Sequence, residues 1–385
     1  MKIVLSGVET NNKGAELMLY AILQEVERKF PKAIVYIDSN RVKQGRSYVI
    51  TNLDFRLITP TKIQNFLSRL HIPGLLFKIG FFSNFLWGTT AIKDVDYFLD
   101  GSGLAFSDKM KINKWGVNFW SHKLNNYSAQ GTKIIFLPQQ FGPAQKEKTK
   151  ALIRVIEKNA NIVMPREKVS MSMLQAVKTS EKYHLFTDFT SLVEGVLPYK
   201  YEHLKNAICI IPNIQMIRKG AINYEDYIQL LQNFVMTCKQ AGYVPYFLIH
   251  AGIKDKELAD ACNRRLSTQI EVVYGLNALE IKGLISTAYL CISSRFHGVA
   301  SSLNSCVPCL ATSWSYKYEE LYNDYGLVDC VLNISNIGQC VTKTKEFLSE
   351  QKNTEIRNVL AGAVPIIKDE TRRMWDLIWS LQDAH

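Results

Sequence analysis

The sequence predicts an α/β protein built from two Rossmann-like domains that face a cleft. Short runs rich in β-branched and aromatic residues alternate with longer segments of helical periodicity, a pattern typical of parallel sheets covered by helices. The chain has 385 residues, more than one ordinary hydrophobic core accommodates. The alternating series also occurs twice, and each series is long enough for a sheet of its own.

The first series predicts an N-terminal domain over residues 1–190. Its strands are short apolar runs, and the loops that follow them carry polar residues and glycines, as the carboxyl ends of parallel strands often do. The expected strands are 2–5, 33–37, 55–58, 97–99, 133–137 and 162–164, with the clearest helices at 14–29 and 148–159.

The second series predicts a C-terminal domain over residues 191–365. The expected strands are 207–211, 244–249, 271–273, 290–292 and 308–311, with helices near 224–241, 255–265, 278–287 and 299–304. The remaining residues, 366–385, carry apolar side chains at helical spacing, including Met374 and Ile378. They predict a helix that crosses back and packs on the first domain.

The bulk composition favours a cytoplasmic protein with an anionic partner. The formal net charge is +11 and 47% of the residues are hydrophobic. No apolar run is long and uncharged enough to predict a spanning helix, and no signal peptide is evident. The basic residues are dispersed and accompany no nucleic-acid motif, so we expect no nucleic acid and look instead to a small anion or an anionic membrane surface.

The eight cysteines indicate reduced core residues rather than a disulfide framework or a metal site. Cys306 and Cys309 form a CxxC pair. Redox-active CxxC pairs have a low thiol pKa because they lie at a helix N-terminus, whereas this pair follows a predicted helix. Histidines or further cysteines at ligand spacing are also missing. We therefore expect no metal ion and no cofactor.

The stretch RLHIPGLLFKIGFFSNFLWG, residues 69–88, is unusually apolar, and its only basic residues are Arg69, His71 and Lys78. Such a segment can lie in a membrane interface, which would make the protein peripheral at the inner face of the membrane. A buried helix or a lid over the cleft explains the same pattern. Periodicity does not separate these alternatives, and both stay open.

The residues with the clearest chemistry are Arg295-Phe296-His297-Gly298, which follow the strand 290–292. At a helix N-terminus, unpaired N–H groups favour an anion, and Gly298 lets the backbone approach it. Arg295 adds a fork of donors suited to carboxylate or phosphate, and His297 adds a group that exchanges protons near neutral pH. The motif therefore predicts a site for a dense anion that also undergoes proton transfer.

Other polar loops follow predicted strands in the same way. Because consecutive strands are often neighbours in a sheet, we expect Lys317, after strand 308–311, to face the same cleft as the Arg295 loop. The N-terminal domain adds Asn12-Lys13-Gly14-Ala15-Glu16, Gly101-Ser102-Gly103, Gln140-Phe-Gly142-Pro143, Arg166-Glu167 and Asp188.

Together these motifs resemble the polysaccharide pyruvyl transferase family over roughly residues 1–330. The most specific match is Ser294-Arg295-Phe296-His297 with Val307-Pro308 and Lys317 downstream. His250 and Asp255 also stand where the family tends to carry a histidine and an aspartate. Ala15, Phe296 and Pro138-Gln139 depart from the family's usual residues, mainly in the N-terminal domain, which leaves the acceptor sugar open.

The resemblance implies a glycosyltransferase-B-like fold, with phosphoenolpyruvate as donor in the C-terminal domain and the acceptor on the N-terminal side. The product would be a pyruvate ketal on two hydroxyls of a sugar in a surface polysaccharide or its lipid-linked precursor. Arg166, Arg295, Gly298 and Lys317 would bind the donor, and His297 would be the general acid with Glu16 or Asp188 as base. Asn12, Lys13, Gly14, Ser102, Gln140 and His250 would line the acceptor side or the cleft.

Two other functions remain open on the sequence. A glycosyltransferase that uses a nucleotide sugar also has a histidine and a glycine at such a strand–helix junction, although Arg295 would crowd a neutral sugar. A non-catalytic anion-binding scaffold would keep the fold without the chemistry.

Overall fold

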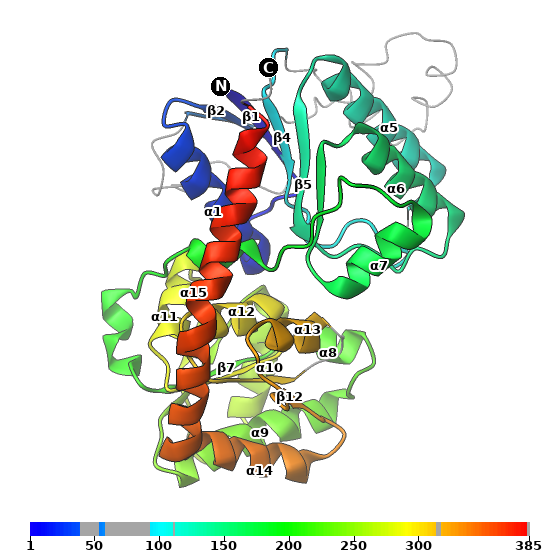
Figure 1. The fold of residues 1–385 in the computed structure, drawn as a ribbon. Helices are drawn as coiled ribbons and strands as arrows, with labels where there is room; N and C mark the ends of the chain where they lie inside the picture. Colours follow the sequence, from blue (N-terminus) through cyan, green and yellow to red (C-terminus); the bar gives the residue numbers. More distant parts are fainter. Residues whose placement is uncertain (39–53, 58–92, 111, 313–316, 383–385) are drawn as a thin grey trace. The chain divides into compact units, whose positions relative to one another are not determined.

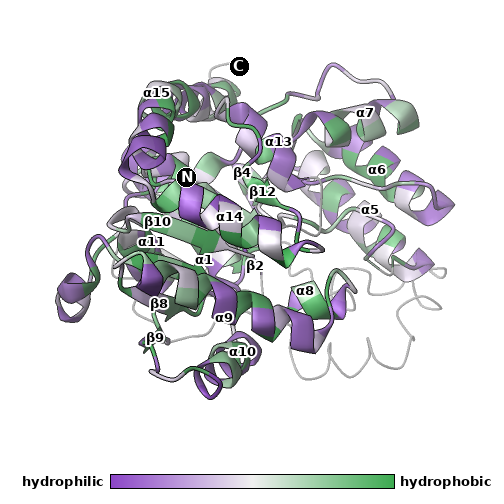
Figure 2. Ribbon diagram, turned by 90° about the horizontal axis from the view of Figure 1, so that it is seen from below, coloured by the Kyte–Doolittle hydropathy of each residue, from purple (hydrophilic) through white to green (hydrophobic). Residues whose placement is uncertain are grey.

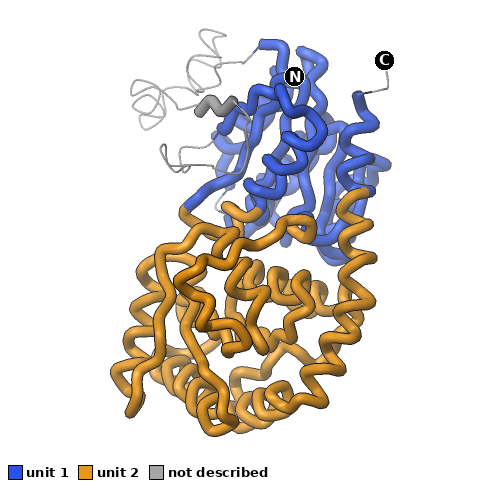
Figure 3. Tube along the Cα trace, turned by 90° about the vertical axis from the view of Figure 1, so that its left-hand side faces the viewer, with its two compact units in different colours: residues 1–10, 18–189, 373–385 blue, residues 11–17, 190–372 orange. Residues whose placement is uncertain are grey.

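The structure is a computed structural model that describes residues 1–38, 54–57, 93–110, 112–312 and 317–382. The chain forms two compact units (Figure 3). Unit 1 comprises residues 1–10, 18–189 and 373–385, and unit 2 comprises residues 11–17 and 190–372. The short segment 11–17 therefore belongs with the C-terminal half. The apolar stretch 69–88 lies outside the described residues, so the structure does not test its membrane or lid interpretation.

Unit 1 is built on a six-stranded parallel sheet of order β3-β2-β1-β4-β5-β6. Helices α5 and α6 cover one face of this sheet and α1 lies on the other (Figure 1). The strands are β1 (Lys2–Ser6), β2 (Ile34–Asp38), β3 (Asp54–Leu57), β4 (Tyr97–Asp100), β5 (Lys133–Gln139) and β6 (Ile162–Pro165). The helices are α1 (Lys13–Lys29), α5 (Lys114–Ala129), α6 (Glu147–Asn159) and α7 (Lys168–Val177).

Unit 2 repeats this plan with a second six-stranded parallel sheet of order β12-β11-β10-β7-β8-β9. Its strands are β7 (Ile208–Ile211), β8 (Pro245–Leu248), β9 (Val272–Val273), β10 (Leu290–Ser293), β11 (Cys309–Thr312) and β12 (Val331–Leu332). Its helices are α8 (Gln215–Arg218), α9 (Tyr224–Gln240), α10 (Ile253–Asn263), α11 (Ala278–Ser286), α12 (Phe296–Asn304), α13 (Lys317–Asp324) and α14 (Ile337–Leu348).

Both sheets are buried between helices, which explains why their strands read as continuous apolar runs. Every residue of β7, β8, β10 and β11 is buried, as expected for parallel strands covered on both faces. Figure 2 shows the resulting pattern, with hydrophobic residues gathered in the sheets and hydrophilic residues on the outer helices. The two parallel sheets confirm the predicted α/β fold.

The last helix, α15, spans Glu350–Ser380 and contains Pro365. The predicted start at residue 366 is therefore wrong. A proline usually ends or kinks a helix because it lacks an N–H donor, but the apolar stripe before it continues the helical period. Residues from Arg373 onward belong to unit 1, where the indole Nε1 of Trp379 donates a 3.0 Å hydrogen bond to Glu25.

None of the helices in the described part of the chain is long and apolar enough to cross a bilayer.

Candidate functional site

The predicted anion site lies where the strand order of unit 2 reverses. β7 and β10 are neighbours at the centre of the sheet, and the chain proceeds from β7 to β8 and β9 on one side and from β10 to β11 and β12 on the other. In open α/β sheets, ligands bind outside the carboxyl ends of the strands at this reversal. Asn213 follows β7 there, and Ser294 and Arg295 follow β10.

A buried polar network ties the two strand ends together. The Nδ2 of Asn213 donates to the carbonyl of Ser294 at 2.7 Å, and the Tyr318 hydroxyl donates to the same carbonyl at 3.0 Å. The Tyr227 hydroxyl accepts from the Asn213 N–H at 3.0 Å and lies 2.8 Å from Ser294 Oγ. Burial raises the pKa of Tyr227 to about 12, so it stays protonated. Hydrogen bonds of this kind hold the backbone before Arg295 in one position.

Sequence reasoning missed Asn213, Tyr227 and Tyr318. Asn213 stands two residues after the predicted strand 207–211, and this position after a strand, which the other polar loops share, is the signal that points to it. The two tyrosines come from α9 and α13, and no local pattern distinguishes them from core residues.

Arg295 is the N-cap of α12, which begins at Phe296. The predicted helix start at residue 299 is therefore wrong, and His297 and Gly298 lie in the first turn rather than in a loop. Gly298 is required there, since an added Cβ would lie 2.9 Å from Cδ1 of Ile211 and closer still to Oγ of Ser293. The close fit lets the first turn of α12 pack directly on the end of the sheet.

The guanidinium of Arg295 is held on one side by Asp255, which is buried in the first turn of α10. One Nη of Arg295 donates to Oδ2 of Asp255, and Oδ1 of the same carboxylate accepts from the N–H of Ile214 at 2.9 Å. Burial raises the pKa of Asp255, and the charge of Arg295 opposes that rise. Among the described residues, Nε of Arg295 is buried without a hydrogen-bond partner, so the fork keeps a donor for a ligand.

The start of α1 packs against His297 within unit 2. A Cβ added to Gly14 would lie 2.8 Å from both Cγ and Cε1 of His297, and closer to Nδ1. The first turns of α1 and α12 therefore meet at this ring, and both helices direct unpaired N–H groups toward their N-termini. Asn12 Oδ1 accepts from the N–H of Gly14 at 3.1 Å, which starts α1. Lys13 and Glu16 form a buried ion pair of 2.5 Å beside it.

His250 follows β8 and is only 3% exposed. Burial is the main cause that lowers its pKa well below the usual value, and the positive charges of Arg295, His297 and Lys13 lower it further. Its Nδ1 is buried and has no hydrogen-bond partner in the described ranges of the chain. His250 is thus a neutral ring among cations.

Lys317 opens α13, and its Nζ lies 5.0 Å from the centroid of the Phe296 ring. β10 and β11 are paired neighbours, which places Lys317 near the Arg295 motif, and a common cleft for the two stays a prediction. Most of the predicted site residues belong to unit 2. They are Asn12, Lys13, Gly14, Glu16, His250, Arg295, His297, Gly298 and Lys317.

The other four predicted residues belong to unit 1. Arg166 is buried between two carboxylates, with Nη1 at 3.7 Å from Asp188 and Nε at 3.5 Å from Glu167. The hydroxyl of Ser102 donates to Asp100 at 3.0 Å, and the Gln140 N–H donates to the carbonyl of Gly103. Arg166 and Asp188 are thus ion-paired to each other within their own unit.

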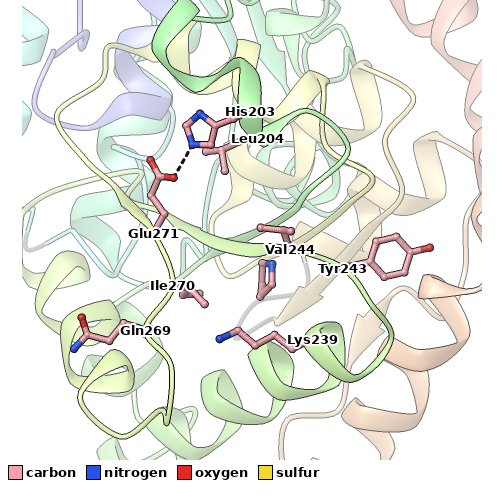
Figure 4. A pocket seen from close by; sticks show the side chains of 9 residues that line it. His203, Leu204, Lys239, Tyr243, Val244, Gln269, Ile270 and Glu271 are labelled. Atoms are coloured by element: carbon pink, nitrogen blue, oxygen red, sulfur yellow. Dashed lines mark hydrogen bonds and ion pairs between the residues drawn. The ribbon is translucent and has the colours of Figure 1, made fainter.

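A pocket of about 340 Å³ lies at the opposite, amino-terminal ends of β7, β8 and β9 (Figure 4). His203 and Glu271 form a 2.8 Å contact at its rim, and Lys239 and Tyr243 also line it. None of the predicted site residues borders this pocket. No cluster of three or more metal-ligating side chains occurs in the part of the chain that the structure describes.

The sequence model of the family described as polysaccharide pyruvyl transferase matches residues 12–316. The chain belongs to this family. The match begins at Asn12 and includes the Arg295 motif, and Lys317 lies one residue beyond it. Family membership makes the protein a transferase. No curated protein matches the chain at a significant level of sequence similarity.

Similar folds occur among solved proteins that are bound to UDP or named as UDP-N-acetylglucosamine 2-epimerases. The Anabaena protein HepE, solved with UDP and glucose, has a TM-score of 0.62 at 10% identity, with 100% of both chains covered. A putative UDP-N-acetylglucosamine 2-epimerase from Listeria monocytogenes has a TM-score of 0.61 at 12% identity and covers 100% of this chain and 97% of its own. MnaA of S. aureus, solved with UDP, has a TM-score of 0.61 at 11% identity, with 100% and 98% covered. At these identities the likeness concerns the fold alone.

Proposed function

We propose that the protein transfers the pyruvyl group of phosphoenolpyruvate to two hydroxyls of a sugar, giving a pyruvate ketal and phosphate. The acceptor is a sugar of a surface polysaccharide or of its lipid-linked precursor. The observation that carries the proposal is the pair Arg295 and His297 at the start of α12. A fixed guanidinium and an imidazole occur together there, at the reversal of strand order in unit 2.

The positive charges of Arg295 and Lys317 suit the donor. Phosphoenolpyruvate carries about three negative charges near neutral pH, on a carboxylate and a phosphate. Arg295 keeps a buried Nε–H donor without a partner among the described residues, and Lys317 lies beside the same helix turn. Two helix N-termini add N–H groups that favour anions. A neutral sugar would offer these donors no negative charge.

The role of His297 follows from the chemistry of an enol ester. Ketal formation requires a proton on the methylene carbon, which makes the neighbouring carbon electrophilic toward a hydroxyl. Arginine and lysine hold negative charge but are poor proton donors near neutral pH, whereas a histidine beside phosphate can give up a proton. We assign this step to His297 and the binding of the phosphate and carboxylate to Arg295, Lys317 and the N–H groups around Gly298.

The test is the release of phosphate from phosphoenolpyruvate, with and without galactoside and mannoside acceptors. In heavy water, the product methyl group should carry one deuterium from the solvent. Binding of phosphoenolpyruvate, in competition with inorganic phosphate, should raise the melting temperature, and UDP-sugars should not. Stabilisation by UDP-sugars alone would favour a nucleotide-sugar glycosyltransferase instead. Tight anion binding without turnover of any acceptor would favour a scaffold.

A further inference from the structure

We propose that His250 is the base that takes the proton from the attacking sugar hydroxyl. This inference rests on the proposed function and adds a second proton-transfer residue to the same site. It replaces the carboxylates that the sequence suggested for this role, Glu16 and Asp188, and it assigns a task to a ring that was expected only to line the cleft.

The position of His250 supports this task. It follows β8, the neighbour of β7, and so lies on the same edge of the sheet as Asn213 and Arg295. Its side chain is almost fully buried, and its Nδ1 has no hydrogen-bond partner among the described residues. Buried polar atoms are nearly always paired, so an unpaired nitrogen beside a cluster of cations indicates a partner that arrives with the substrates.

The charged groups that most lower the pKa of His250 are cations of unit 2. They are Lys13 from the first turn of α1 and Arg295 and His297 at the start of α12. These charges and burial both lower the pKa of His250, and burial is the larger cause. Binding of an anionic donor offsets the charges but does not expose the ring to water. His250 is therefore neutral before the reaction, and the bound anion, by offsetting the cations, makes it easier for the ring to accept a proton.

The two carboxylates are less suited to the role. The Glu16 carboxylate is buried in a 2.5 Å ion pair with Lys13. Asp188 is ion-paired with Arg166 in unit 1. Both carboxylates thus already have a cation as partner, whereas Nδ1 of His250 has no hydrogen-bond partner among the described residues.

Two histidines are enough to accept and return every proton that moves in the reaction. His297 gives its proton to the methylene carbon, and the first hydroxyl oxygen bonds to the neighbouring carbon while its proton passes to His250. The second hydroxyl oxygen then bonds to the same carbon, and the carbon–oxygen bond to phosphate breaks. The phosphate leaves with the electron pair and takes the proton from His250, and the proton of the second hydroxyl returns to His297. Both rings regain their starting states, and the products are the ketal and hydrogen phosphate.

The first experiment compares His250→Asn with His203→Asn. Asparagine keeps a polar atom near the position of Nδ1 but accepts no proton, and His203 is an exposed histidine of the same unit at the opposite edge of the sheet. We expect His250→Asn to lower kcat by about 10²–10⁴ while the Kd for phosphoenolpyruvate changes by less than about threefold. His203→Asn should retain wild-type kcat and Kd.

The second experiment needs no variant and covers the case in which His250→Asn does not fold. The chain has seven histidines, so selective ¹⁵N labelling allows their titration to be followed by NMR with phosphoenolpyruvate bound. We expect one buried histidine to stay neutral well below pH 6.5, the usual pKa of the side chain. Protonation of every histidine of the complex at pH 7 would overturn the inference, since a charged His250 is no base.

The outcomes separate the inference from the proposed function. Wild-type turnover by His250→Asn, or a defect wholly in donor affinity, would refute the role of His250 and leave the pyruvyl transfer intact. If the wild-type protein neither binds phosphoenolpyruvate nor releases phosphate from it, both proposals fail together.

Discussion

A methyl group at Gly14 should disable catalysis by moving His297. Gly14 lies in the first turn of α1, and a Cβ there would stand 2.8 Å from Cγ and Cε1 of His297. Ordinary van der Waals contact begins at 3.4 Å, so the ring carbons must move by about 3.4 − 2.8 = 0.6 Å. Nδ1 would be closer still, and a displacement approaching 1 Å at a reacting group costs on the order of 10²-fold in rate. We therefore expect Gly14→Ala to lower kcat about 10²-fold.

The fold should tolerate the same change. Alanine is favoured over glycine in a helix by about 1 kcal/mol, and this gain offsets part of the strain of moving one ring. Thermal unfolding of Gly14→Ala should thus resemble that of the wild type, and phosphate release should carry the defect. Gly362→Ala is the matched control, because Gly362 also lies in a helix of unit 2 and a Cβ there meets nothing within 4 Å.

A double-mutant cycle identifies the group that is displaced. If Gly14→Ala acts through His297, it should change the rate of a His297→Gln enzyme by less than about threefold, since the two changes remove the same contribution. A full additional loss in that background would show that the methyl group disturbs something else. Wild-type kcat for Gly14→Ala would refute the packing of α1 on a catalytic His297.

The remaining predictions concern binding and stability. Arg295→Ala should weaken phosphoenolpyruvate binding by about 1.5–3 kcal/mol in titration calorimetry. Arg295→Lys should also bind phosphoenolpyruvate weakly, because an ammonium does not reproduce the guanidinium fork. If the alanine variant binds with wild-type affinity, Arg295 is not part of the site. Asp255→Asn should weaken binding about tenfold by releasing one side of that guanidinium, and an unchanged Kd would show that Asp255 positions nothing. Burial raises the pKa of Asp100, so the folded protein favours the protonated carboxyl. The stability that the protonated carboxyl contributes is therefore present at low pH and is lost as the pH rises through the folded-state pKa. The free energy of unfolding of Asp100→Asn, relative to the wild type, should therefore increase between pH 4.5 and pH 8, and a difference independent of pH would contradict this cause.

The strands and most helices could be predicted because their signals are local. Buried parallel strands such as β10 are short apolar runs, and helices such as α9 repeat apolar residues at helical spacing. The errors arose where two local signals conflict. The last helix, predicted from residue 366, starts at Glu350 and continues through Pro365, and residues 295–298, predicted as a loop, include the first turn of α12 with Gly298. In both cases packing of the helix on the core outweighed the propensity of one residue.

The sequence by itself determined the family, the α/β plan and the pairing of Arg295 with His297, because each is read from short motifs or from local periodicity. Only the tertiary structure decided which distant residues join that pair. The central contact of the site links Asn213 to Ser294, 81 positions apart, and it exists because the sheet places β7 beside β10. The same arrangement brings in Asp255 and His250, and the crossing of residues 11–17 into unit 2 brings Gly14 against His297. Strand order is a property of the whole core, so no local pattern specifies which loops will meet at its edge.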